Sequence, residues 1–561
     1  MDLVYFIVLV GVLVFVHELG HFACAKAFGV CVLRFSLGFG PKVAGFRRGE
    51  TEYILAAIPL GGYVKMLGES PTEADSAADN KRAFSAQPLW RRLVIVVAGP
   101  TMNLLLPVLL LFFVFLGDRR LPPSVIGSVF TNEPADGRLQ PGDRVLSIDG
   151  NDVATFYDVS RIVDSNPGTA LHLRVQRSGH EIDVTVTPAL TTVPGELDIP
   201  HRVGRIGISV HEPMAIVGVT STSSPAALAE LRTFDRIVSV RGRVVDRWRD
   251  LEQSLAENRG TTVPLTVLRP MEVRSALGGL VDFDVYEPTV MTLAPNPLSP
   301  VPGDAPGDAA GVGLEPTDLY VRTVATGGAE GRIGVMPGDR LLELDGEPIL
   351  QWARFRDRMR AAKGRAHTLS WRRGDTVITH AYQLEGRRVA TSTGDRITEY
   401  RLGVDHWFLK QSEPRVPNPS LLAYALQRSI GRTLDLIELT ITLFGRLFRR
   451  ELSIGSIAGP LTIFRAAGQA ARVGPVSYLE LMALLSINLA LINLLPIPLL
   501  DGGQALFLLL EATLRRRFTA RARQVASLIG LVLLIALIVI AVKNDVEREW
   551  PLLDRSDTSA E

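Results

Sequence analysis

Residues 15–21 read FVHELGH, and the organisation of the whole chain follows from this stretch. His17 and His21 are four residues apart, so a helix carries both imidazoles on one face, within about 40° of each other and one turn apart. Zinc binds neutral imidazole nitrogens, and Glu18 between the histidines is a candidate general base for an attacking water. Over residues 3–16 no side chain is charged or strongly polar, so this helix is predicted to lie in lipid.

A pair of histidines at this spacing is by itself a weak signal, because many such pairs on soluble helices are structural. In an apolar helix, however, a functional role for the two histidines is the stronger interpretation. Two imidazoles and a carboxylate are costly to place in hydrocarbon, so an ionisable cluster inside a membrane helix indicates a functional site. We therefore interpret His17 and His21 as ligands of one metal ion, with Glu18 beside it.

The composition indicates a membrane protein with substantial water-soluble parts. The 561 residues suffice for several domains, 47% of them are hydrophobic, and the formal net charge of +1 gives no global field that would recruit nucleic acid. The two cysteines, Cys24 and Cys31, lie in and just after the first apolar segment, so no disulfide framework is expected. No Lys or Arg precedes this segment, and we expect a retained span with its N-terminus outside, not a signal peptide.

Four apolar segments predict an α-helical membrane core of four spans. We place the spans at residues 1–28, 93–116, 476–503 and 525–542. The connection over 29–92 is rich in Lys and Arg, and Arg515-Arg516-Arg517 follows the third span, which places both on the cytoplasmic side. In the second span Gly99-Pro100 and Asn103 interrupt the apolar run, and such residues are tolerated at membrane depth where they line a site.

Residues 29–92 also carry β-type patterning, over 32–37, 52–56 and 59–65. Two interpretations are open. The segment is an ordinary hairpin, or it is a membrane-associated β-loop that dips towards the motif and offers a sheet edge to an extended substrate by strand addition.

Between the second and third spans a twelve-residue pattern repeats. LQPGDRVLSIDG at 139–150 recurs as VMPGDRLLELDG at 335–346 and, more loosely, as LRTFDRIVSVRG at 231–242. Each copy reads as a Gly/Pro turn, a strand and a tight turn, followed by a helix and further strands. The pattern predicts three β-rich modules outside the membrane.

The modules resemble PDZ domains in tandem, which hold extended or C-terminal peptides at a sheet edge. We place them at 122–195, 200–294 and 317–388, with a Pro/Gly-rich linker over 294–316. Phe234 replaces a glycine of the pattern, so the middle copy is degenerate. A purely structural or size-filtering role stays open for each module.

The region 389–475 is predicted to lie on the membrane surface. Apolar side chains recur at helical spacing over 418–450, with arginines between them. A helix lying on the bilayer explains this pattern, although a soluble amphipathic helix has the same one.

Asp501 is the expected third ligand. It follows Pro496 and Pro498, which end a regular helix, and irregular backbone at membrane depth normally lines a site. The first and third spans run in the same direction and carry their polar residues near the inner end, so Asp501 reaches the depth of the histidines. A role as a helix cap is the alternative. Two histidines, one carboxylate and an open position are typical of a tetrahedral catalytic zinc site.

Five motifs carry a family resemblance: HELGH at 17–21, FSLGFGPK at 35–42, TEYILAAIPLGGYVKMLGE at 51–69, AGPTMN at 98–103 and NLLPIPLLDGG at 493–503. Together they resemble the bacterial site-2 proteases, which are intramembrane zinc metalloproteases, and in particular their RseP-like branch. The resemblance implies zinc as the cofactor, with ligands His17, His21 and Asp501. Glu18 is then the general base. The substrate-binding residues implied are Asn488 and Asn493, together with Gly61, Gly62 and Tyr63 in a β-loop that clamps the extended segment.

By this resemblance the chain hydrolyses peptide bonds within transmembrane segments of single-span membrane proteins, such as anti-sigma factors after a first outer cut. Signal-peptide remnants are a second substrate class. The chain is expected in the bacterial inner membrane, in contact with lipid, with its PDZ-like modules in the periplasm and its active site towards the cytoplasm. It departs from the branch in having three modules where two are usual, and in Gln504, which replaces a common histidine.

Two other classes of protein compete with this interpretation. A catalytically inactive membrane-anchored PDZ scaffold predicts erosion of the motif residues, yet all of them are present: His17, Glu18, His21 and Asp501. A soluble-type zinc peptidase should lack flanking apolar spans, and the four apolar segments argue against it.

Overall fold

The structure is a computed structural model, and it divides into two compact units that we describe one at a time. Unit 1 comprises Met1–Arg119, Ala390–Arg396 and Ser420–Glu561, and unit 2 comprises Arg120–Val389 and Ile397–Pro419. The description covers residues 1–69, 81–194, 200–258, 260–271, 285–294, 311–362, 364–390, 396–406, 410–449, 458–514 and 518–553. Most of the predicted linker 294–316 lies outside the described residues, as does Arg515-Arg516-Arg517.

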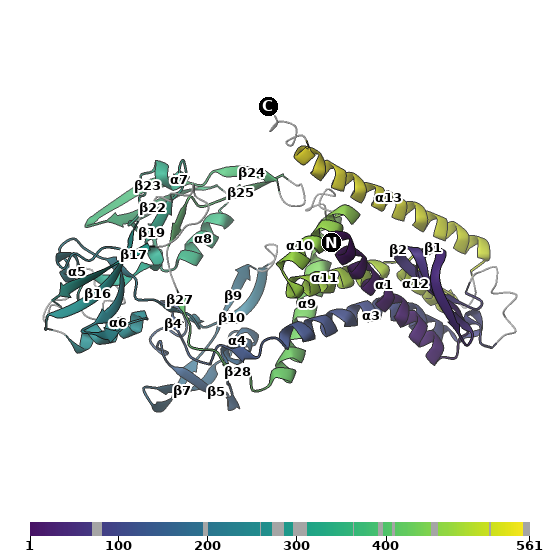
Figure 1. Ribbon diagram of the computed structural model, residues 1–561, viewed down its shortest axis with the longest axis horizontal. Helices are drawn as coiled ribbons and strands as arrows, with labels where there is room; N and C mark the ends of the chain where they lie inside the picture. The colour runs from purple at the N-terminus through teal and green to yellow at the C-terminus, as the bar shows by residue number, and fades with distance from the viewer. Residues whose placement is uncertain are drawn as a thin grey trace. The chain divides into compact units, whose positions relative to one another are not determined.

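Unit 1 is a helical bundle that carries one β-structure (Figure 1). Its elements are α1 (Asp2–Ala27), β1 (Val32–Arg48), β2 (Thr51–Met66), the short 3₁₀ helix η1 (Phe84–Ala86), α3 (Leu89–Phe115), α9 (Leu421–Phe448), α10 (Pro460–Val473), α11 (Pro475–Asn493), α12 (Asp501–Leu514) and α13 (Ala520–Leu553). In the described part of the chain four helical segments are long and apolar enough to cross a membrane: Asp2–Ala27, Leu89–Phe115, Pro475–Asn493 and Gln524–Val546. They fit the predicted helical membrane core.

The third apolar segment does not form one continuous helix. We expected a span over 476–503, but α11 ends at Asn493 and α12 begins at Asp501. Pro496 and Pro498 lie between the two helices, and a proline inside a helix removes a backbone hydrogen bond and clashes with the preceding turn. The break leaves Asp501 at the first position of a new helix.

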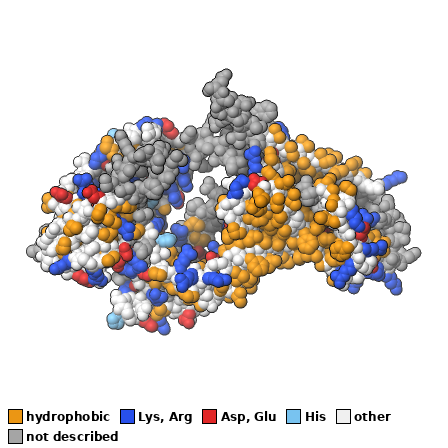
Figure 2. All heavy atoms as spheres, viewed as in Figure 1, with side chains coloured by type: hydrophobic (Ala, Val, Ile, Leu, Met, Phe, Trp, Pro, Cys, Tyr) orange, Lys and Arg blue, Asp and Glu red, His pale blue; other side chains and the backbone are white. Residues whose placement is uncertain are grey.

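The outer surface of unit 1 is apolar. Leu105, Leu109 and Phe113 of α3 are more than half exposed, and so are many apolar side chains of α13. Figure 2 shows a broad hydrophobic face over these helices. A soluble protein rarely exposes a contiguous apolar surface of this extent, so we treat the four long helices as membrane-spanning.

Inside unit 1 two apolar clusters hold the helices together. The first joins α1, α3, α10 and α11, and it includes Leu13 of α1. The second joins the end of α1, the β-structure, the start of α3, and α12, and it includes Ala25 of α1. His17 and His21 lie between these two positions on α1, so the polar motif sits at the junction of two apolar cores.

Helix α9 exposes several large apolar side chains and buries several small polar ones. Leu422 and Leu434 are exposed, whereas Ser429, Thr433 and Thr440 are buried. Helix α9 packs against α3 and α11, and small side chains allow such close approach between membrane helices. This arrangement fits a lipid-facing helix better than an amphipathic helix of a soluble protein.

Strands β1 and β2 form more than an ordinary hairpin. Residues 34–37 pair with 62–65 on one side and with 52–55 on the other, and 52–55 also pair with 44–47. The two strands therefore fold into a narrow sheet of four segments, in which 62–65 is the outermost segment on one side.

An ion-paired turn anchors this sheet to α1. Glu50, between β1 and β2, accepts hydrogen bonds from Lys26 of α1 and from Arg82, at 2.7 Å each. The guanidinium of Arg82, and after it the ammonium of Lys26, hold the pKa of Glu50 at about 2. The turn is therefore charged and paired throughout the physiological pH range.

Unit 2 contains three modules. Module 1 has β4 (Ser128–Val129), β5 (Arg144–Ile148), β6 (Asn151–Asp152), α4 (Phe156–Ser165), β7 (Leu171–Arg177), β8 (His180–Val186) and β11 (Ile208–Ser209). Module 2 has β13 (Val217–Val219), α5 (Pro225–Leu228), β14 (Arg236–Val240), β15 (Arg243–Val244), α6 (Trp248–Glu257), β16 (Val263–Met271), β17 (Val285–Leu293) and β18 (Leu314–Pro316). Module 3 has η3 (Thr317–Leu319), β19 (Val321–Val324), α7 (Ala329–Arg332), β20 (Arg340–Leu344), β21 (Glu347–Pro348), α8 (Trp352–Ala361), β22 (Ala366–Arg373), β23 (Thr376–Gln383) and β26 (Val404–His406). The remaining strands pair as β3 (Arg120–Leu121) with β28 (Val416–Pro417), β9 (Ala189–Pro194) with β10 (Pro200–Arg205), β12 (Glu212–Pro213) with β27 (Lys410–Gln411), and β24 (Gly386–Ala390) with β25 (Arg396–Tyr400).

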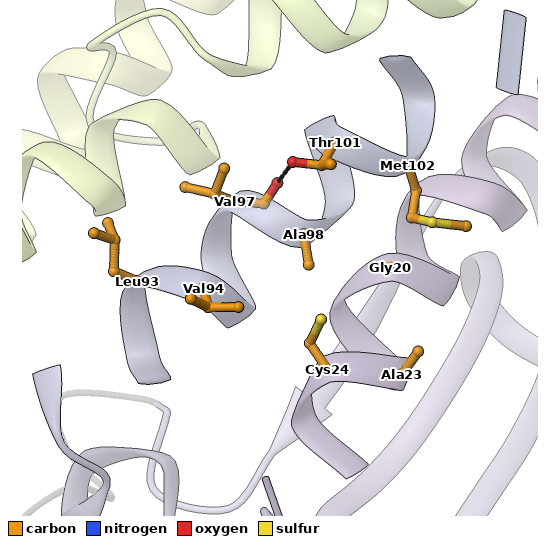
Figure 3. Close-up of a pocket in the computed structure, with 9 residues that line it drawn as sticks. All are labelled: Gly20, Ala23, Cys24, Leu93, Val94, Val97, Ala98, Thr101 and Met102. Carbon is orange, nitrogen blue, oxygen red and sulfur yellow. Dashed lines mark hydrogen bonds between the residues drawn. The ribbon is translucent and has the colours of Figure 1, made fainter. Parts of the chain in front are cut away.

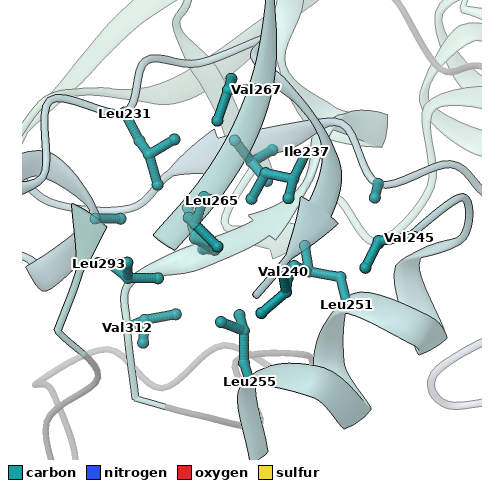
Figure 4. Close-up of a cluster of buried hydrophobic side chains, with 14 of the residues drawn as sticks. Leu231, Ile237, Val240, Val245, Leu251, Leu255, Leu265, Val267, Leu293 and Val312 are labelled. Carbon is teal, nitrogen blue, oxygen red and sulfur yellow. The ribbon is translucent and has the colours of Figure 1, made fainter. Parts of the chain in front are cut away.

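The three modules share one topology. Their four-stranded sheets have the orders β6-β5-β7-β8, β15-β14-β16-β17 and β21-β20-β22-β23, and the first strand of each module pairs with a strand that returns after the sheet. Each module has its own apolar core. In module 2, Leu251 and Leu255 of α6 pack with sheet residues such as Ile237 and Leu265 (Figure 4).

An equivalent Asp–Arg ion pair occurs in each of the three modules. The buried aspartate of each repeat accepts two hydrogen bonds, of 2.7–2.9 Å, from the arginine 34 residues later. The pairs are Asp143–Arg177, Asp235–Arg269 and Asp339–Arg373. Each pair is bidentate and therefore fixes the turn before one strand to the end of another.

Phe234 occupies a backbone conformation that favours glycine. Its φ is 78°, close to the 93° of Gly142 and the 90° of Gly338 at the same position of the other modules. A bulky residue here costs about 1 kcal/mol or more. Its ring is buried, and the guanidinium of Arg322 from module 3 lies 5.1 Å from the ring centroid. Packing between modules 2 and 3 therefore compensates for the strained backbone.

Replacing Arg373 by Met is expected to destabilise module 3, because the buried carboxylate of Asp339 loses its charged partner. Breaking a buried pair from one side costs about 3–5 kcal/mol, and the partial exposure of Arg373 lowers the expected loss to about 2–3 kcal/mol. Hydrogen exchange of β20 and β22 in the full chain measures this loss. The exposed Arg365 supplies the control Arg365→Met, and equal protection in both variants would contradict the prediction.

Candidate metal centre

Three side chains from two helices converge on one point of unit 1. The Nε2 atoms of His17 and His21 lie 3.3 Å apart, and Asp501 Oδ2 lies 3.1 Å from the first and 3.5 Å from the second. Both histidines are only 8% exposed. Within the described ranges this is the one group of His, Cys, Asp and Glu side chains arranged closely enough to share a metal ion.

The three separations fit a tetrahedral zinc ion. Ligand atoms about 2.0–2.1 Å from zinc lie about 3.3–3.4 Å from one another in a tetrahedron. The measured distances of 3.1, 3.3 and 3.5 Å scatter around that value. Two imidazole nitrogens and one carboxylate oxygen are also a donor set that zinc accepts, and three protein ligands leave a fourth position for water or substrate.

Glycines where α1 crosses α3 make room for the imidazoles. A Cβ atom at Gly99 would lie 2.3 Å from His21 Nε2 and 2.9 Å from His17 Cε1. A Cβ atom at Gly20 would lie 2.4 Å from the carbonyl oxygen of Ala98. A larger side chain at either position would push the helices or the rings apart, so the close crossing requires glycine at both.

The two glycines after Asp501 allow the start of α12 to pack closely against the backbone that follows α11. A Cβ atom at Gly502 would lie 2.3 Å from the carbonyl oxygen of Leu494, and one at Gly503 would lie 2.1 Å from that of Ile497. The chain therefore turns tightly after the proline-containing segment. This turn brings Asp501 beside α1, although almost the whole chain separates them in sequence.

Polar groups behind the imidazoles orient the rings. His21 Nδ1 lies 2.8 Å from the carbonyl oxygen of Ile95, so Nδ1 carries the proton and Nε2 keeps its lone pair. His17 Nδ1 lies 3.3 Å from the side-chain amide of Asn103. The sequence singled out Asn103 as a polar residue in an apolar run, but a backbone carbonyl such as that of Ile95 leaves no signal in a sequence.

Glu18 lies between the metal cluster and the β1–β2 sheet. Its side chain is buried, and its Cγ would lie 3.0 Å from a Cβ atom at Gly62. The backbone N–H of Val64 donates a hydrogen bond to its carboxylate. Residues 62–65 pair with 34–37 on one side, and no other described strand pairs with their second side.

The two asparagines of α11 have different surroundings. Asn493 Nδ2 lies 3.4 Å from His17 Nε2, so this residue is part of the site. Asn488 Oδ1 accepts a hydrogen bond of 3.1 Å from Thr440 of α9. The structure therefore brings Asn493 to the metal cluster, whereas Asn488 connects α11 to α9.

Gly61 and Tyr63 flank Gly62 in the sheet. The Tyr63 hydroxyl accepts a hydrogen bond from Arg34, and its ring stacks on that of Phe39 with centroids 6.1 Å apart. Gly61 has a φ of 104°, and a Cβ atom there would lie 2.2 Å from the Phe39 ring. These contacts shape the edge beside Glu18 without touching the histidines.

An apolar cavity of about 470 Å³ lies between α1 and α3 (Figure 3). It is lined by Gly20, Ala23, Cys24, Leu93, Val94, Val97, Ala98, Thr101 and Met102. The hydroxyl of Thr101 donates to the carbonyl of Val97, which leaves the lining almost wholly apolar. The lining includes none of the three converging side chains, so this cavity suits hydrocarbon and is not the reaction centre.

A buried donor set of this composition, beside a carboxylate and inside an apolar helical unit, defines a metal-dependent hydrolase of the membrane. The model of peptidase family M50 matches residues 5–537, and the chain belongs to this family. It is a zinc metalloendopeptidase of the site-2 protease type, which confirms the resemblance carried by the sequence motifs.

Known proteins resemble the chain over nearly its full length. A protein of Neisseria meningitidis serogroup A, described as a candidate zinc metalloprotease, is 29% identical over 552 residues, which are 97% of this chain and 98% of its own. The regulator of sigma-E protease RseP of Escherichia coli K12 is 26% identical over 556 residues, 98% of each chain. A solved PDZ domain of an SdrC-like protein from Listeria monocytogenes is 20% identical and covers 15% of this chain and 83% of its own, with a TM-score of 0.13. A TM-score of 0.13 does not establish that the two proteins share a fold.

Replacing Gly99 by Ala is expected to lower both bound zinc and peptidase activity, because the new methyl group meets the His21 ring. Displacement of a reacting group by about 1 Å costs about 100-fold in rate, and we expect a loss of that order. Zinc content and cleavage of a membrane reporter are the measurements. Gly11→Ala on α1 is the matched control, since a Cβ atom there would have no neighbour within 4 Å. Full zinc loading and activity in Gly99→Ala would contradict the assignment of the site.

Proposed function

We propose that this peptidase hydrolyses peptide bonds within the transmembrane segments of single-span membrane proteins, in regulated intramembrane proteolysis. Its substrates are chains already cut once on the outer side, such as anti-sigma factors, with signal-peptide remnants as a second class. The observation that carries the proposal is the place of His17, His21 and Asp501, which are held among helices whose outer surface is apolar. The name of the Escherichia coli relative, a regulator of sigma-E, supports the same assignment.

In this proposal His17, His21 and Asp501 hold the zinc ion through Nε2, Nε2 and a carboxylate oxygen. A zinc ion held there would polarise the scissile carbonyl and lower the pKa of its bound water towards about 7. Glu18 accepts the proton of the attacking water and delivers it to the leaving nitrogen of the peptide bond. Glu18 interacts electrostatically with His17, His21 and Asp501, which supports this role.

Asn493 is proposed to seat the substrate at the reaction centre. Its amide lies beside the donor atoms of the cluster, where an N–H group can donate to a substrate carbonyl. Asn488 supports the substrate site indirectly in this scheme, because its bond to Thr440 holds α11 against α9.

The outer edge of the β1–β2 sheet is proposed to clamp the substrate. A peptide bond inside a helix is shielded by its own hydrogen bonds, so the substrate segment must unwind before attack. The unpaired edge of residues 62–65, where Gly62 packs against Glu18, carries backbone groups that an extended segment can pair with by strand addition. Gly61, Gly62 and Tyr63 would then hold the scissile bond beside the general base.

We further propose that the site lies towards the cytoplasmic side of the bacterial inner membrane and the modules lie in the periplasm. The basic residues at the sheet end of unit 1 support this orientation through the positive-inside rule; they include Lys26, Arg82 and Arg91. The modules are proposed to be PDZ-like, and to capture peptides or filter substrates by size before cleavage.

Replacing Glu18 by Gln is expected to lower the cleavage rate strongly while zinc stays bound, because the amide keeps the size of the side chain but cannot accept the proton. General-base catalysis contributes about 10²- to 10⁴-fold, and we expect a loss in that range. Cleavage of a single-span reporter and zinc content are measured on the same preparations.

Asp501→Asn serves as the comparison, because weakening a ligand should release zinc as well as lower the rate. Equal cleavage by Glu18→Gln and the unaltered chain would exclude the base role. Loss of zinc in Glu18→Gln would show that this residue holds the site together instead.

Replacing Gly62 by Ala is expected to lower cleavage about tenfold or more without loss of zinc. The added Cβ atom would lie 2.8 Å from the carbonyl oxygen of Ser36 and 3.0 Å from Glu18 Cγ, so the sheet edge must move away from the base. A reporter whose scissile segment is rich in helix-breaking residues should be cleaved fastest by both proteins, since it unwinds most easily. An unchanged rate in Gly62→Ala would remove the sheet edge from the substrate path.

A further inference from the structure

His17 faces the metal cluster with one ring nitrogen and the interior of the bundle with the other. Its Nε2 lies 3.1 Å from Asp501 Oδ2 and 3.3 Å from His21 Nε2. Its Nδ1 lies 3.3 Å from Nδ2 of Asn103, a fully buried residue of α3 one turn after Gly99. Asn103 is therefore the polar group that meets the back of this imidazole.

The role of a metal ligand determines where His17 carries its proton. A neutral imidazole has one N–H group, and the nitrogen that binds a metal must offer its lone pair. Since Nε2 faces the cluster, the proton belongs on Nδ1, and a buried N–H group needs an acceptor. His21 meets this requirement with the carbonyl oxygen of Ile95 at 2.8 Å, and His17 requires an acceptor of its own.

Asn103 holds an acceptor that is otherwise unused. Its Oδ1 is buried and has no hydrogen-bond partner in the described part of the chain. With Nδ2 turned to His17 Nδ1, two N–H groups would face each other and Oδ1 would stay unsatisfied. A half-turn of the amide about Cβ–Cγ exchanges oxygen and nitrogen at nearly the same positions. It pairs Oδ1 with the Nδ1 proton of His17, and Nδ2 then takes the buried position that Oδ1 left.

We propose that Asn103 is a positioning residue of the metal centre: its Oδ1 accepts the Nδ1 proton of His17 and thereby fixes the tautomer in which Nε2 is free for zinc. This inference rests on the proposed role of His17 as a ligand. Partners of this kind behind a metal-bound histidine typically contribute about 10- to 100-fold to metal affinity.

The backbone of Asn103 is held in place independently of its side chain. Pro107 lies within α3 and has no N–H group, so it donates nothing to the carbonyl oxygen four residues earlier, which is that of Asn103. Ser486 of α11 supplies the missing donor, and its hydroxyl lies 2.7 Å from that oxygen. Ser486 therefore offers a control that disturbs the same residue and leaves the amide untouched.

Three variants of the full chain in detergent test the proposal. Asn103→Asp keeps an acceptor and removes the donor, Asn103→Leu removes both at similar size, and Ser486→Ala removes the backbone contact alone. Zinc affinity is measured by competition with a chelator. The visible spectrum after replacement of zinc by Co(II) reports the ligand set, and both readouts are independent of peptidase activity.

We expect Asn103→Leu to weaken zinc binding about 10- to 100-fold and to change the Co(II) spectrum. Asn103→Asp and Ser486→Ala should bind zinc nearly as the unaltered chain does, with its spectrum. Unaltered affinity in Asn103→Leu would overturn the proposal. An Asn103→Asp variant that binds as weakly as Asn103→Leu would overturn it too, because the donor of Asn103 would then be the group that matters. If the leucine variant does not fold, an Asn103→Asp variant that binds zinc at least about 10-fold more weakly than the unaltered chain overturns the proposal.

His17→Ala separates this inference from the proposed function. Zinc bound by His17→Ala as tightly as by the unaltered chain would refute the ligand role of His17, and the role of Asn103 would fall with it. Loss of zinc in His17→Ala together with full affinity in Asn103→Leu would refute the role of Asn103 alone.

Discussion

The structure of unit 1 depends on keeping two imidazoles and two carboxylates together inside an apolar bundle. A charged side chain such as Asp costs about 2.5–3.5 kcal/mol at the centre of a membrane helix on insertion scales, and buried imidazoles also need hydrogen-bond partners, so each of the four groups must have a partner. Glycines at the crossing of α1 and α3 leave space for the two imidazole rings. The carbonyl oxygen of Ile95 and the side-chain amide of Asn103 contact the Nδ1 atoms of these rings. The apolar clusters on either side of the motif then hold this polar centre at one position on α1.

Two non-helical features of unit 1 lie beside this centre. The break between α11 and α12 places Asp501 beside the two histidines. The folded β1–β2 sheet places its outermost segment next to Glu18. Regular helices satisfy their own backbone groups and offer a substrate nothing to pair with, whereas a sheet edge does. In the proposed function this sheet edge is the part of the site with which an unwound substrate pairs.

Unit 2 repeats one Asp–Arg ion pair in each of its three modules. Its three modules share a bidentate Asp–Arg pair at the same spacing, and Phe234 keeps the backbone conformation of a glycine because its ring packs between modules 2 and 3. At the same junction Tyr320 and Arg372 of module 3 both donate to Glu315 of module 2, each at 2.6 Å. Modules 2 and 3 are thus joined by buried polar contacts as well as by apolar packing.

The sequence alone determined the features that depend on local spacing: two imidazoles on one helix face, apolar segments of spanning length, and the repeat of the modules. It also singled out Asp501, because two prolines before a carboxylate in an apolar run are visible without a fold. Only the tertiary structure decided that Asn493 reaches the cluster while Asn488 bonds α9, that residues 62–65 form the edge at Glu18, and that Ile95 and Asn103 stand behind the histidines. These facts depend on how helices cross and which backbone groups they leave available for hydrogen bonds. The order of side chains in the sequence specifies neither the crossing point of two helices nor which backbone carbonyl is free to accept a hydrogen bond.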